Sequence, residues 1–261
     1  MHSLDYGQIM TEIISIHSFR GGTGKSNTTA NLAGLLASQG KRVAVIDTDI
    51  QSPGIHILLG IEDTSVVQYA LNDYLWDKCA IQDAAYDVTD NVAAGLPGKI
   101  YLIPSSIKPG EIARILKEGY EVRRLHQGIK DITNVLNIDY LLIDTHPGLN
   151  EETLLSFALS NVVGIVMRPD RQDYQGTGVT IQVARRLGIK RMALIINKVP
   201  SNLDAEQLKE DMQQTYDCEV AAVLPHSDEM MRLASEGIFV LHYPNNPLTQ
   251  AFKQVAEVLT R

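Results

Sequence analysis

The chain has few cysteines, few aromatic residues, no long apolar run and no excess of positive charge. Its two cysteines, Cys79 and Cys218, lie far apart and form no Cys-x-x-Cys pair. This argues against a disulfide framework or a zinc site and favours a reducing, cytoplasmic environment. No apolar run reaches the length of a membrane span, and no secretory signal pattern opens the chain. The formal net charge is −8, so nucleic-acid binding would require a local basic patch.

The rest of the composition is that of an ordinary globular protein. Apolar residues make up 44% of the 261 positions and charged residues 21%, a balance that predicts one domain spanning residues 1–261. Residues 1–11 are predicted to form a loose N-terminal arm. Residues 64–98 have the weakest pattern, and we expect them to be an insertion near the active face or an interface.

From residue 12 onward, apolar runs of strand length alternate with segments of helical period. The predicted strands are Glu12–His17, Arg42–Ile46, Ile100–Pro104, Tyr140–Ile143, Val162–Met167, Arg191–Ile196 and Glu219–Val223. The predicted helices are Asn27–Ser38, Pro109–Lys117, Val122–Leu136, Glu151–Leu159, Gln175–Leu187, Ala205–Thr215, Asp228–Ser235 and Pro247–Leu259. Most of these strands are continuously apolar, as in a sheet buried on both faces. The pattern therefore predicts an α/β fold with a doubly wound, mostly parallel sheet and helices on both faces.

A glycine-rich loop joins the first predicted strand to the first helix. Residues 19–26 read Phe-Arg-Gly-Gly-Thr-Gly-Lys-Ser, which is a phosphate-binding loop in its expected context. In such a loop the backbone N–H groups surround phosphate oxygens, Lys25 reaches the β- and γ-phosphates, and the Ser26 hydroxyl ligates Mg²⁺. The predicted nucleotide contacts from this segment are Gly21, Gly22, Thr23, Gly24, Lys25, Ser26 and Asn27.

The loop departs from the usual pattern at two positions, and the departure resembles one family. Phe19 stands where a glycine is usual, and Arg20 directly precedes the Gly-Gly-Thr-Gly-Lys-Ser run. This resembles the deviant Walker A loop of the ParA/MinD ATPases, Lys-Gly-Gly-x-Gly-Lys-Ser/Thr. In that family the first lysine crosses a dimer interface to the partner's nucleotide. The resemblance implies the same catalytic role for Arg20, because arginine keeps the charge and suits phosphate. The alternative is a solvated loop cation.

Two aspartates follow the second predicted strand. Asp47 and Asp49 stand two residues apart at its end, where both carboxylates can face one metal–phosphate centre. The segment resembles switch I of the same family. By that resemblance Asp49 would position or polarise the attacking water, and Asp47 would lie near Mg²⁺ and its waters. The alternative is a pair of turn-forming aspartates.

The strand Tyr140–Ile143 ends in Asp144, which is the Walker B arrangement for a Mg²⁺-holding carboxylate. Thr145, His146, Pro147 and Gly148 follow, and Gly148 would let the switch II backbone approach the γ-phosphate. His146 could act as a base, but phosphoryl transfer relies mainly on positioning and charge, which favours an ordinary loop residue.

The base-binding residues are predicted from a later strand. Asn197-Lys198-Val199-Pro200 resembles the guanine-binding Asn-Lys-x-Asp motif, but Pro200 replaces the aspartate that would pair with guanine. Adenine is therefore favoured. The resemblance assigns Asn197 to the base and Pro225 to a proline loop against adenine, with an ordinary strand-ending proline as the alternative.

The resemblance runs from Ile13 to the last helix and implies ATP and Mg²⁺ as cofactors. It favours the ParA-like cargo-positioning branch: an ATP-sandwich homodimer on nonspecific nucleoid DNA, with an adaptor on a carboxysome, plasmid or chromosome. Arg20 in place of the lysine resembles the carboxysome-positioning McdA type. No basic amphipathic tail follows Leu248–Leu259, so no membrane anchor is expected. Two alternatives stay open: a MinD-like membrane regulator and a low-turnover ATP-binding module.

DNA binding would need exposed basic side chains. The candidates are Arg123, Arg124, Arg185, Arg186, Lys190, Arg191, Lys253 and Arg261. A dimer could combine two weak basic patches into one DNA-binding surface. For each residue taken singly, the alternative is that it belongs to a solvated helix face with no binding role.

Overall fold

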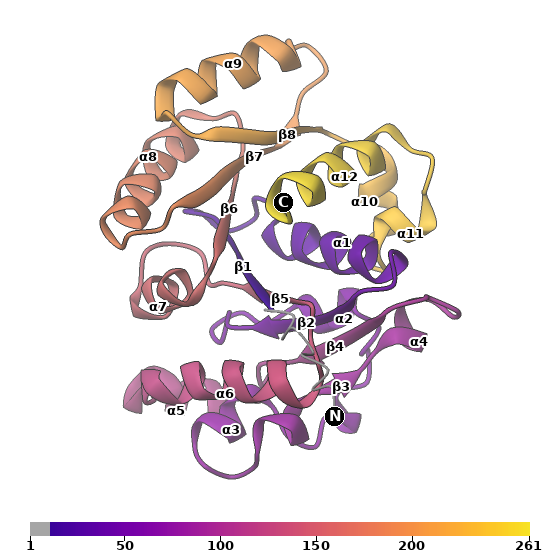
Figure 1. Cartoon of the computed structure of the whole chain (residues 1–261), viewed down its shortest axis with the longest axis vertical. Coiled ribbons are helices and arrows are strands. Elements are labelled where there is room, and N and C mark those ends of the chain that lie inside the picture. The colour runs from indigo at the N-terminus through magenta and orange to yellow at the C-terminus, as the bar shows by residue number, and fades with distance from the viewer. Residues whose placement is uncertain (1–10) are drawn as a thin grey trace, which may run out of the picture.

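A computed structural model describes residues 11–261, and these form one eight-stranded sheet with helices on both faces (Figure 1). The strands are β1 (Glu12–His17), β2 (Arg42–Asp47), β3 (Tyr86–Asp87), β4 (Lys99–Ile103), β5 (Tyr140–Asp144), β6 (Val162–Met167), β7 (Arg191–Val199) and β8 (Glu219–Pro225). Their order is β3-β4-β2-β5-β1-β6-β7-β8, and every pairing is parallel except β3 with β4. The predicted doubly wound, mostly parallel sheet is confirmed.

Helices cover the sheet on both sides. They are α1 (Lys25–Ser38), α2 (Ile55–Leu58), α3 (Leu71–Leu75), α4 (Thr89–Val92), α5 (Pro109–Glu118), α6 (Val122–Val135), α7 (Glu151–Leu159), α8 (Arg171–Arg186), α9 (Ala205–Tyr216), α10 (Asp228–Leu233), α11 (Phe239–His242) and α12 (Pro247–Leu259). Two short 3₁₀ turns, η1 (Thr64–Val66) and η2 (Ile81–Ala84), lie between α2 and β3.

Alternate residues of each strand enter different cores, which is why the runs are apolar throughout. Val43 and Val45 of β2 pack with α1, α11 and α12, whereas Ala44 and Ile46 pack with α3, α5 and α6. At the other end of the sheet, α7, α8 and α9 bury their apolar faces on β6, β7 and β8. Figure 1 shows α1 and α12 on the side of the sheet opposite α6, α7 and α8.

The largest difference from the predicted elements lies between residues 64 and 98. This segment contains η1, α3, η2, α4 and the two-residue strand β3, all too short for a periodic signal.

Elsewhere, α8 begins four residues before its predicted start because Asp170 caps it, accepting hydrogen bonds from the N–H groups of Gln172 and Asp173. Residues 1–10 of the predicted arm lie outside the described residues. Thr11 is attached to the body by a 2.7 Å hydrogen bond from its Oγ1 to the Ile138 carbonyl oxygen.

The topology brings the functional candidates to one edge. Asp47 at the end of β2 is the register partner of Asp144 at the end of β5, which in turn pairs with Ile16 of β1. Because β1 leads directly into the glycine-rich loop, three neighbouring parallel strands deliver two carboxylates and the loop together. Ligands of open α/β sheets bind at this carboxyl edge.

Candidate nucleotide-binding site

The glycine-rich loop is shaped by two residues that need glycine. Gly22 has φ 76° and Gly24 has φ 100°, both in the left-handed region that side chains disfavour. A Cβ at Gly24 would also lie 2.3 Å from Asn197 Nδ2. Gly24 precedes the first residue of α1, and no side chain caps this helix. The N–H groups of the first turn are therefore available to an anion.

Lys25 is buried among carboxylates. Its side chain is 7% exposed, and its Nζ lies 2.9 Å from Asp144 Oδ1 and 3.9 Å from Asp49 Oδ2. Thr29, one turn further along α1, donates its hydroxyl to the same Asp144 oxygen at 3.2 Å. The structure thus brings together Lys25, Asp49 and Asp144, which come from three separate segments of the chain.

Asp47 is the most constrained acid of this group. Burial raises the pKa of its carboxyl group well above the usual range; the Asp144 and Asp49 charges raise it further, and the Lys25 ammonium opposes them. Its Oδ1 accepts a hydrogen bond from the Asp49 N–H at 2.9 Å, whereas its buried Oδ2 has no partner within residues 11–261. Lys25 therefore pairs with two carboxylates, those of Asp49 and Asp144, while one oxygen of Asp47 lacks a donor among residues 11–261.

The donor set fits Mg²⁺, which takes carboxylate, hydroxyl, phosphate and water oxygens. Asp47 has a free oxygen, and Ser26 is half-buried at the start of α1. Within residues 11–261, no group of three or more His, Cys, Asp or Glu side chains could hold a metal ion by itself. A Mg²⁺ ion here would therefore need phosphate and water oxygens to complete its shell.

His146 contacts Asp49, a pairing that the sequence did not predict. His146 Nδ1 lies 2.7 Å from Asp49 Oδ1, which also accepts hydrogen bonds from the backbone N–H and the hydroxyl of Ser52. The loop after β5 is thereby tied to the loop after β2. The position of His146 two residues after Asp144 was the available signal, but we interpreted it as an ordinary loop residue.

His17 is a second residue that the sequence analysis missed. It ends β1, is fully buried, and places Nδ1 2.8 Å from the Thr145 hydroxyl with its ring edge-on to Phe157. Burial, and then the Lys25 charge, lower the pKa of His17 to about 3. The ring is therefore neutral near pH 7 and supports Thr145 rather than supplying charge.

Arg20 does not face the loop's own phosphate cradle. Its Nη1 lies 3.4 Å from both Asp170 Oδ1 and Asp173 Oδ1 at the start of α8. The Arg20 side chain is 37% exposed and therefore remains accessible. The cation that the sequence singled out is held by its own subunit.

Asn197 and Pro225 lie beside the loop, at a hollow of about 340 Å³. Asn197 Nδ2 donates to the Thr23 carbonyl oxygen at 2.7 Å, and Lys198 Nζ donates to the Gly22 carbonyl oxygen at 2.8 Å. In addition to Gly24, Asn27, Asn197 and Pro225, the lining includes Lys198, His226, Ser227, Met230, Met231, Leu248 and Phe252. The apolar lining from α10 and α12 was missed, because those residues carried only a core-packing pattern.

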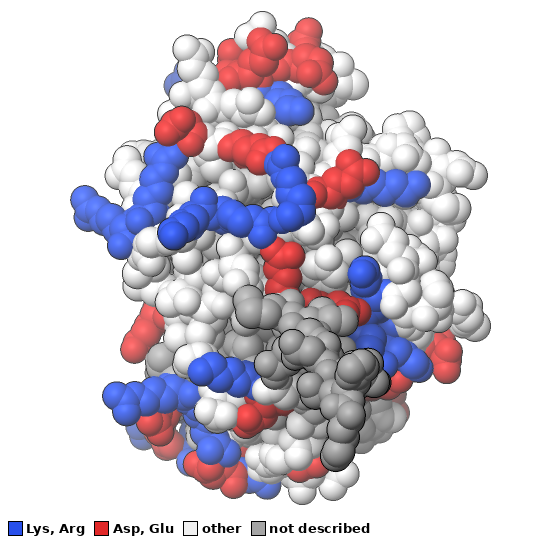
Figure 2. All heavy atoms as spheres, in the orientation of Figure 1, with Lys and Arg blue, Asp and Glu red and all other residues white. Residues whose placement is uncertain are grey.

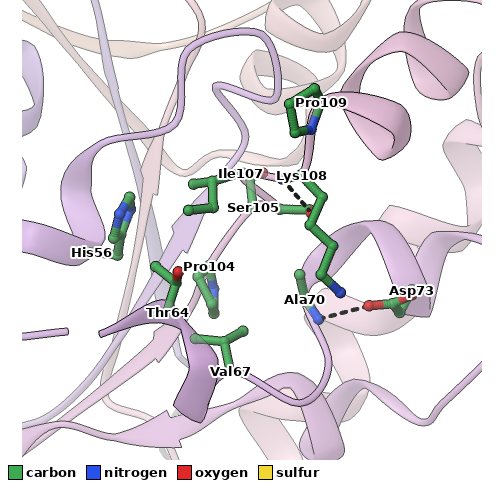
Figure 3. A pocket seen from close by; sticks show the side chains of 11 residues that line it. His56, Thr64, Val67, Ala70, Asp73, Pro104, Ser105, Ile107, Lys108 and Pro109 are labelled. Atoms are coloured by element: carbon green, nitrogen blue, oxygen red, sulfur yellow. Dashed lines mark hydrogen bonds between the residues drawn. The ribbon is translucent and has the colours of Figure 1, made fainter. Parts of the chain in front are cut away.

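A second hollow of about 270 Å³ lies beyond the end of β4 (Figure 3). His56 and Lys108 lie on opposite sides of it, with Pro104, Ser105 and Ile107 between them. Ser105 donates its hydroxyl to the Asp47 carbonyl oxygen at 2.7 Å. Ser105, which lines this hollow, therefore connects it to the backbone of Asp47.

The predicted basic patch is partly neutralised. Arg191 pairs with Glu12, and Arg261 pairs with Glu219. Arg185 donates to the Tyr216 carbonyl oxygen at 2.9 Å. In Figure 2 a row of Lys and Arg crosses the region where Figure 1 places α8 and the C-terminus, with Asp and Glu at its borders. No ion pair of Arg186, Lys190 or Lys253 is found within residues 11–261, and all three are exposed.

The loop, the sheet order and the carboxylates at its edge define a P-loop nucleotide-binding protein. Residues 14–240 match the CobQ/CobB/MinD/ParA nucleotide binding domain, and the chain belongs to this family. Its ParA and MinD members are ATPases, so at the level of the family this chain is an ATP-binding ATPase.

Individual relatives span nearly the whole chain. An uncharacterized ATP-binding protein of Methanocaldococcus jannaschii is 30% identical over 252 residues, covering 96% of this chain and 88% of the relative. The Pyrococcus horikoshii MinD structure with Mg-ADP has a TM-score of 0.78 at 25% identity and covers 97% of both chains. The apo McdA structure from Cyanthece has a TM-score of 0.75 at 19% identity, covering 96% of this chain and all of that chain; it supports the fold alone.

Among residues 11–261, no helix is both long and apolar enough to cross a membrane.

Replacing Gly24 with alanine should weaken nucleotide binding without unfolding the protein. The new Cβ would meet Asn197 Nδ2 at 2.3 Å in a left-handed backbone, so the loop must change shape. We expect ADP affinity, measured by calorimetry, to fall at least about 10-fold, corresponding to roughly 1.4 kcal/mol. Gly21→Ala is the matched control, because its Cβ would meet only Pro147 Cγ at 4.0 Å. Equal affinities in the two variants would contradict the assigned loop geometry.

Proposed function

We propose that this chain is a single-domain, Mg²⁺-dependent ATPase that forms an ATP-sandwich homodimer and positions an intracellular cargo on nonspecific DNA. The observation that carries the ATPase part is the charge arrangement at the carboxyl edge of the sheet. Lys25 is buried between Asp144 and Asp49, and the adjacent Asp47 keeps an unpartnered oxygen. Such a centre is suited to a triphosphate with its cation, which would supply both the missing positive charge and the oxygens that replace the carboxylates around Lys25.

The roles follow from where each side chain lies. The N–H groups of Gly21, Gly22, Thr23 and Gly24 and the start of α1 would bind phosphate oxygens, with Lys25 transferring its contact from Asp144 to the β- and γ-phosphates. Ser26, Asp47 and Asp144 would hold Mg²⁺, which lowers the negative charge on the phosphates. Asn27, Asn197 and Pro225 border the hollow that would receive adenine.

Asp49 would orient the attacking water. Its Oδ1 is fixed by Ser52 and His146, while Oδ2 faces Lys25 at 3.9 Å. Hydrolysis in this class depends on positioning more than on covalent chemistry. His146 therefore serves as an orienting partner of Asp49 in this proposal. The second subunit would contribute Arg20 across the interface, where a guanidinium would stabilise charge developing on the phosphates.

The cargo-positioning part rests on family likeness and on surface charge. Arg186, Lys190 and Lys253 are exposed without an ion pair among the described residues, so a dimer would present two such sets to the DNA backbone. Binding would place the protein on the nucleoid in the cytoplasm. An adaptor on a carboxysome, plasmid or chromosome would stimulate hydrolysis and release.

A MinD-like membrane regulator is the second candidate, because a MinD structure with Mg-ADP is among the similar structures at 25% identity. The apolar residues of α12 argue against a free membrane-binding face. Leu248, Phe252, Val255 and Leu259 are buried in the core.

Asp49→Ala should separate ATP binding from hydrolysis. Loss of the water-orienting carboxylate is expected to reduce the hydrolysis rate at saturating ATP by about 100-fold, within the range of positioned acid–base groups. Binding should persist, so ATP-bound dimers should accumulate. Turnover by phosphate release and mass by light scattering check both effects. Asp90→Ala, an exposed acid on α4, is the control; turnover equal to that of this control would remove Asp49 from the mechanism.

Nonspecific DNA binding should require ATP. We expect the wild type to bind a random-sequence duplex at low salt with ATP and Mg²⁺, and to bind weakly with ADP. Arg186→Ala with Lys190→Ala should weaken the complex and lower its salt dependence, because fewer counterions are released. Fluorescence anisotropy at several salt concentrations measures both. Absence of DNA binding together with ATP-dependent sedimentation on anionic liposomes would favour the MinD-like alternative.

A further inference from the structure

Phe19 and Arg20, which directly precede the Gly-Gly-Thr-Gly-Lys-Ser run, both lie against α8. Arg20 reaches Asp170 and Asp173, and Phe19 lies against Gly176 one turn further along the same helix. We refer to Asp170, which caps α8, together with Asp173 and Gly176 of the helix, as the α8 seat.

The contact of Arg20 with the two acids is long, and both acids have other hydrogen-bond donors. Arg20 Nη1 is shared between two carboxylates at 3.4 Å, a long distance for a charged hydrogen bond. Asp173 is buried and has further donors, since it accepts from the backbone N–H of Arg168 at 2.9 Å and from Arg168 Nε at 3.2 Å. Asp170 likewise keeps Arg168 Nη2 at 3.1 Å. Departure of Arg20 therefore leaves neither acid without a partner.

The Phe19 contact explains a glycine inside a helix. Gly176 is buried in the middle of α8, where glycine is less favourable than alanine. A Cβ at this position would lie 2.0 Å from Phe19 Cδ1. The helix thus has no side chain at the point where the Phe19 ring packs, although Phe19 as a residue stays 36% exposed.

The same short segment also contacts the loop after β5. The Gly148 N–H donates to the Ser18 carbonyl oxygen at 3.0 Å, and the Ser18 hydroxyl donates to the Arg20 carbonyl oxygen at 2.8 Å. Residues 18–20 therefore lie between α8 on one side and the switch II glycine on the other. A change at Gly148 on γ-phosphate binding would be transmitted to Arg20 through two hydrogen bonds.

We propose that the α8 seat holds Arg20 within its own subunit, and that pairing of two ATP-bound subunits must first release it. Asp173 and Gly176 are then positioning residues, which act on the partner's nucleotide only through Arg20. The inference rests on the proposed function, because it presupposes an ATP-dependent dimer. The free energy needed to release Arg20 from the α8 seat would weaken dimerisation.

The test measures the protein concentration at which half of the chains are dimeric, with a non-hydrolysable ATP analogue and Mg²⁺. Asp173→Asn keeps the shape of the side chain but removes its charge, and Gly176→Ala displaces the Phe19 ring. Each should lower this concentration by about 2- to 5-fold, the range for a partly exposed ion pair. The double variant should shift little further, because both changes release the same segment.

Two controls make the result specific. Asp217→Asn removes an acid that pairs with Arg185, on an exposed residue with φ 48° that asparagine tolerates, and should leave dimerisation unchanged. ADP affinity of the monomers should also be unchanged. General damage to the fold would weaken dimerisation, so a shift to lower concentration cannot come from a merely structural role.

The outcomes separate the two claims. If the wild type binds the analogue and stays monomeric, the proposed sandwich dimer is wrong, and the proposed role of the α8 seat is wrong as well. If the wild type dimerises but Asp173→Asn and Gly176→Ala both fail to shift the midpoint, or shift it upward, only the seat is overturned. Shifts that add fully in the double variant would also overturn it, because the two residues would then act independently.

Discussion

The burial of several like charges around one lysine is the constraint on which the rest of the site depends. Asp47, Asp49 and Asp144 lie at the ends of two neighbouring strands, and Lys25 pairs with Asp49 and Asp144. Carboxylates in such an environment repel one another and lose hydration, which is why the pKa of Asp47 is raised. The protein tolerates this cost because the sheet fixes the strand ends in register and α1 holds Lys25 beneath them.

The same constraint explains the loops that surround the centre. The Asp49 carboxylate is fixed by Ser52 and His146, so the segments after β2 and β5 are connected before any ligand binds. Gly148 is in turn bonded to Ser18, which adjoins Arg20. The carboxylates around Lys25 are therefore connected to residues 18–20 by the Asp49–His146 hydrogen bond, the backbone from His146 to Gly148 and the Gly148–Ser18 hydrogen bond. The segment that leads into the P-loop therefore contacts both the loop after β5 and the start of α8, in addition to its covalent links to β1 and α1.

The sequence predicted those parts of the structure that follow from local pattern. The apolar runs gave the strands because each is buried on both faces, and the position of Asp47 and Asp144 after such runs placed them at the carboxyl edge. Short elements such as β3 and α2 were not predicted, because segments of two to four residues are too short to show a hydrophobic period. Contacts between segments that are far apart in the sequence were not predicted either. Nothing in the local sequence pairs His146 with Asp49, fits Phe19 onto Gly176 or places Met230 and Phe252 at the base hollow.

The Mg²⁺ dependence of ATP affinity tests the central claim most directly. Adding a triphosphate to a centre that already holds three carboxylates and one lysine should be unfavourable unless a divalent cation enters with it. Titration calorimetry of ATP with Mg²⁺, and again after chelation, measures this difference on the unmodified protein. ATP should bind at least about 10-fold more tightly with Mg²⁺, a difference of roughly 1.4 kcal/mol. Equal affinity in the chelated protein would contradict it, because the carboxylates would then not face the phosphates.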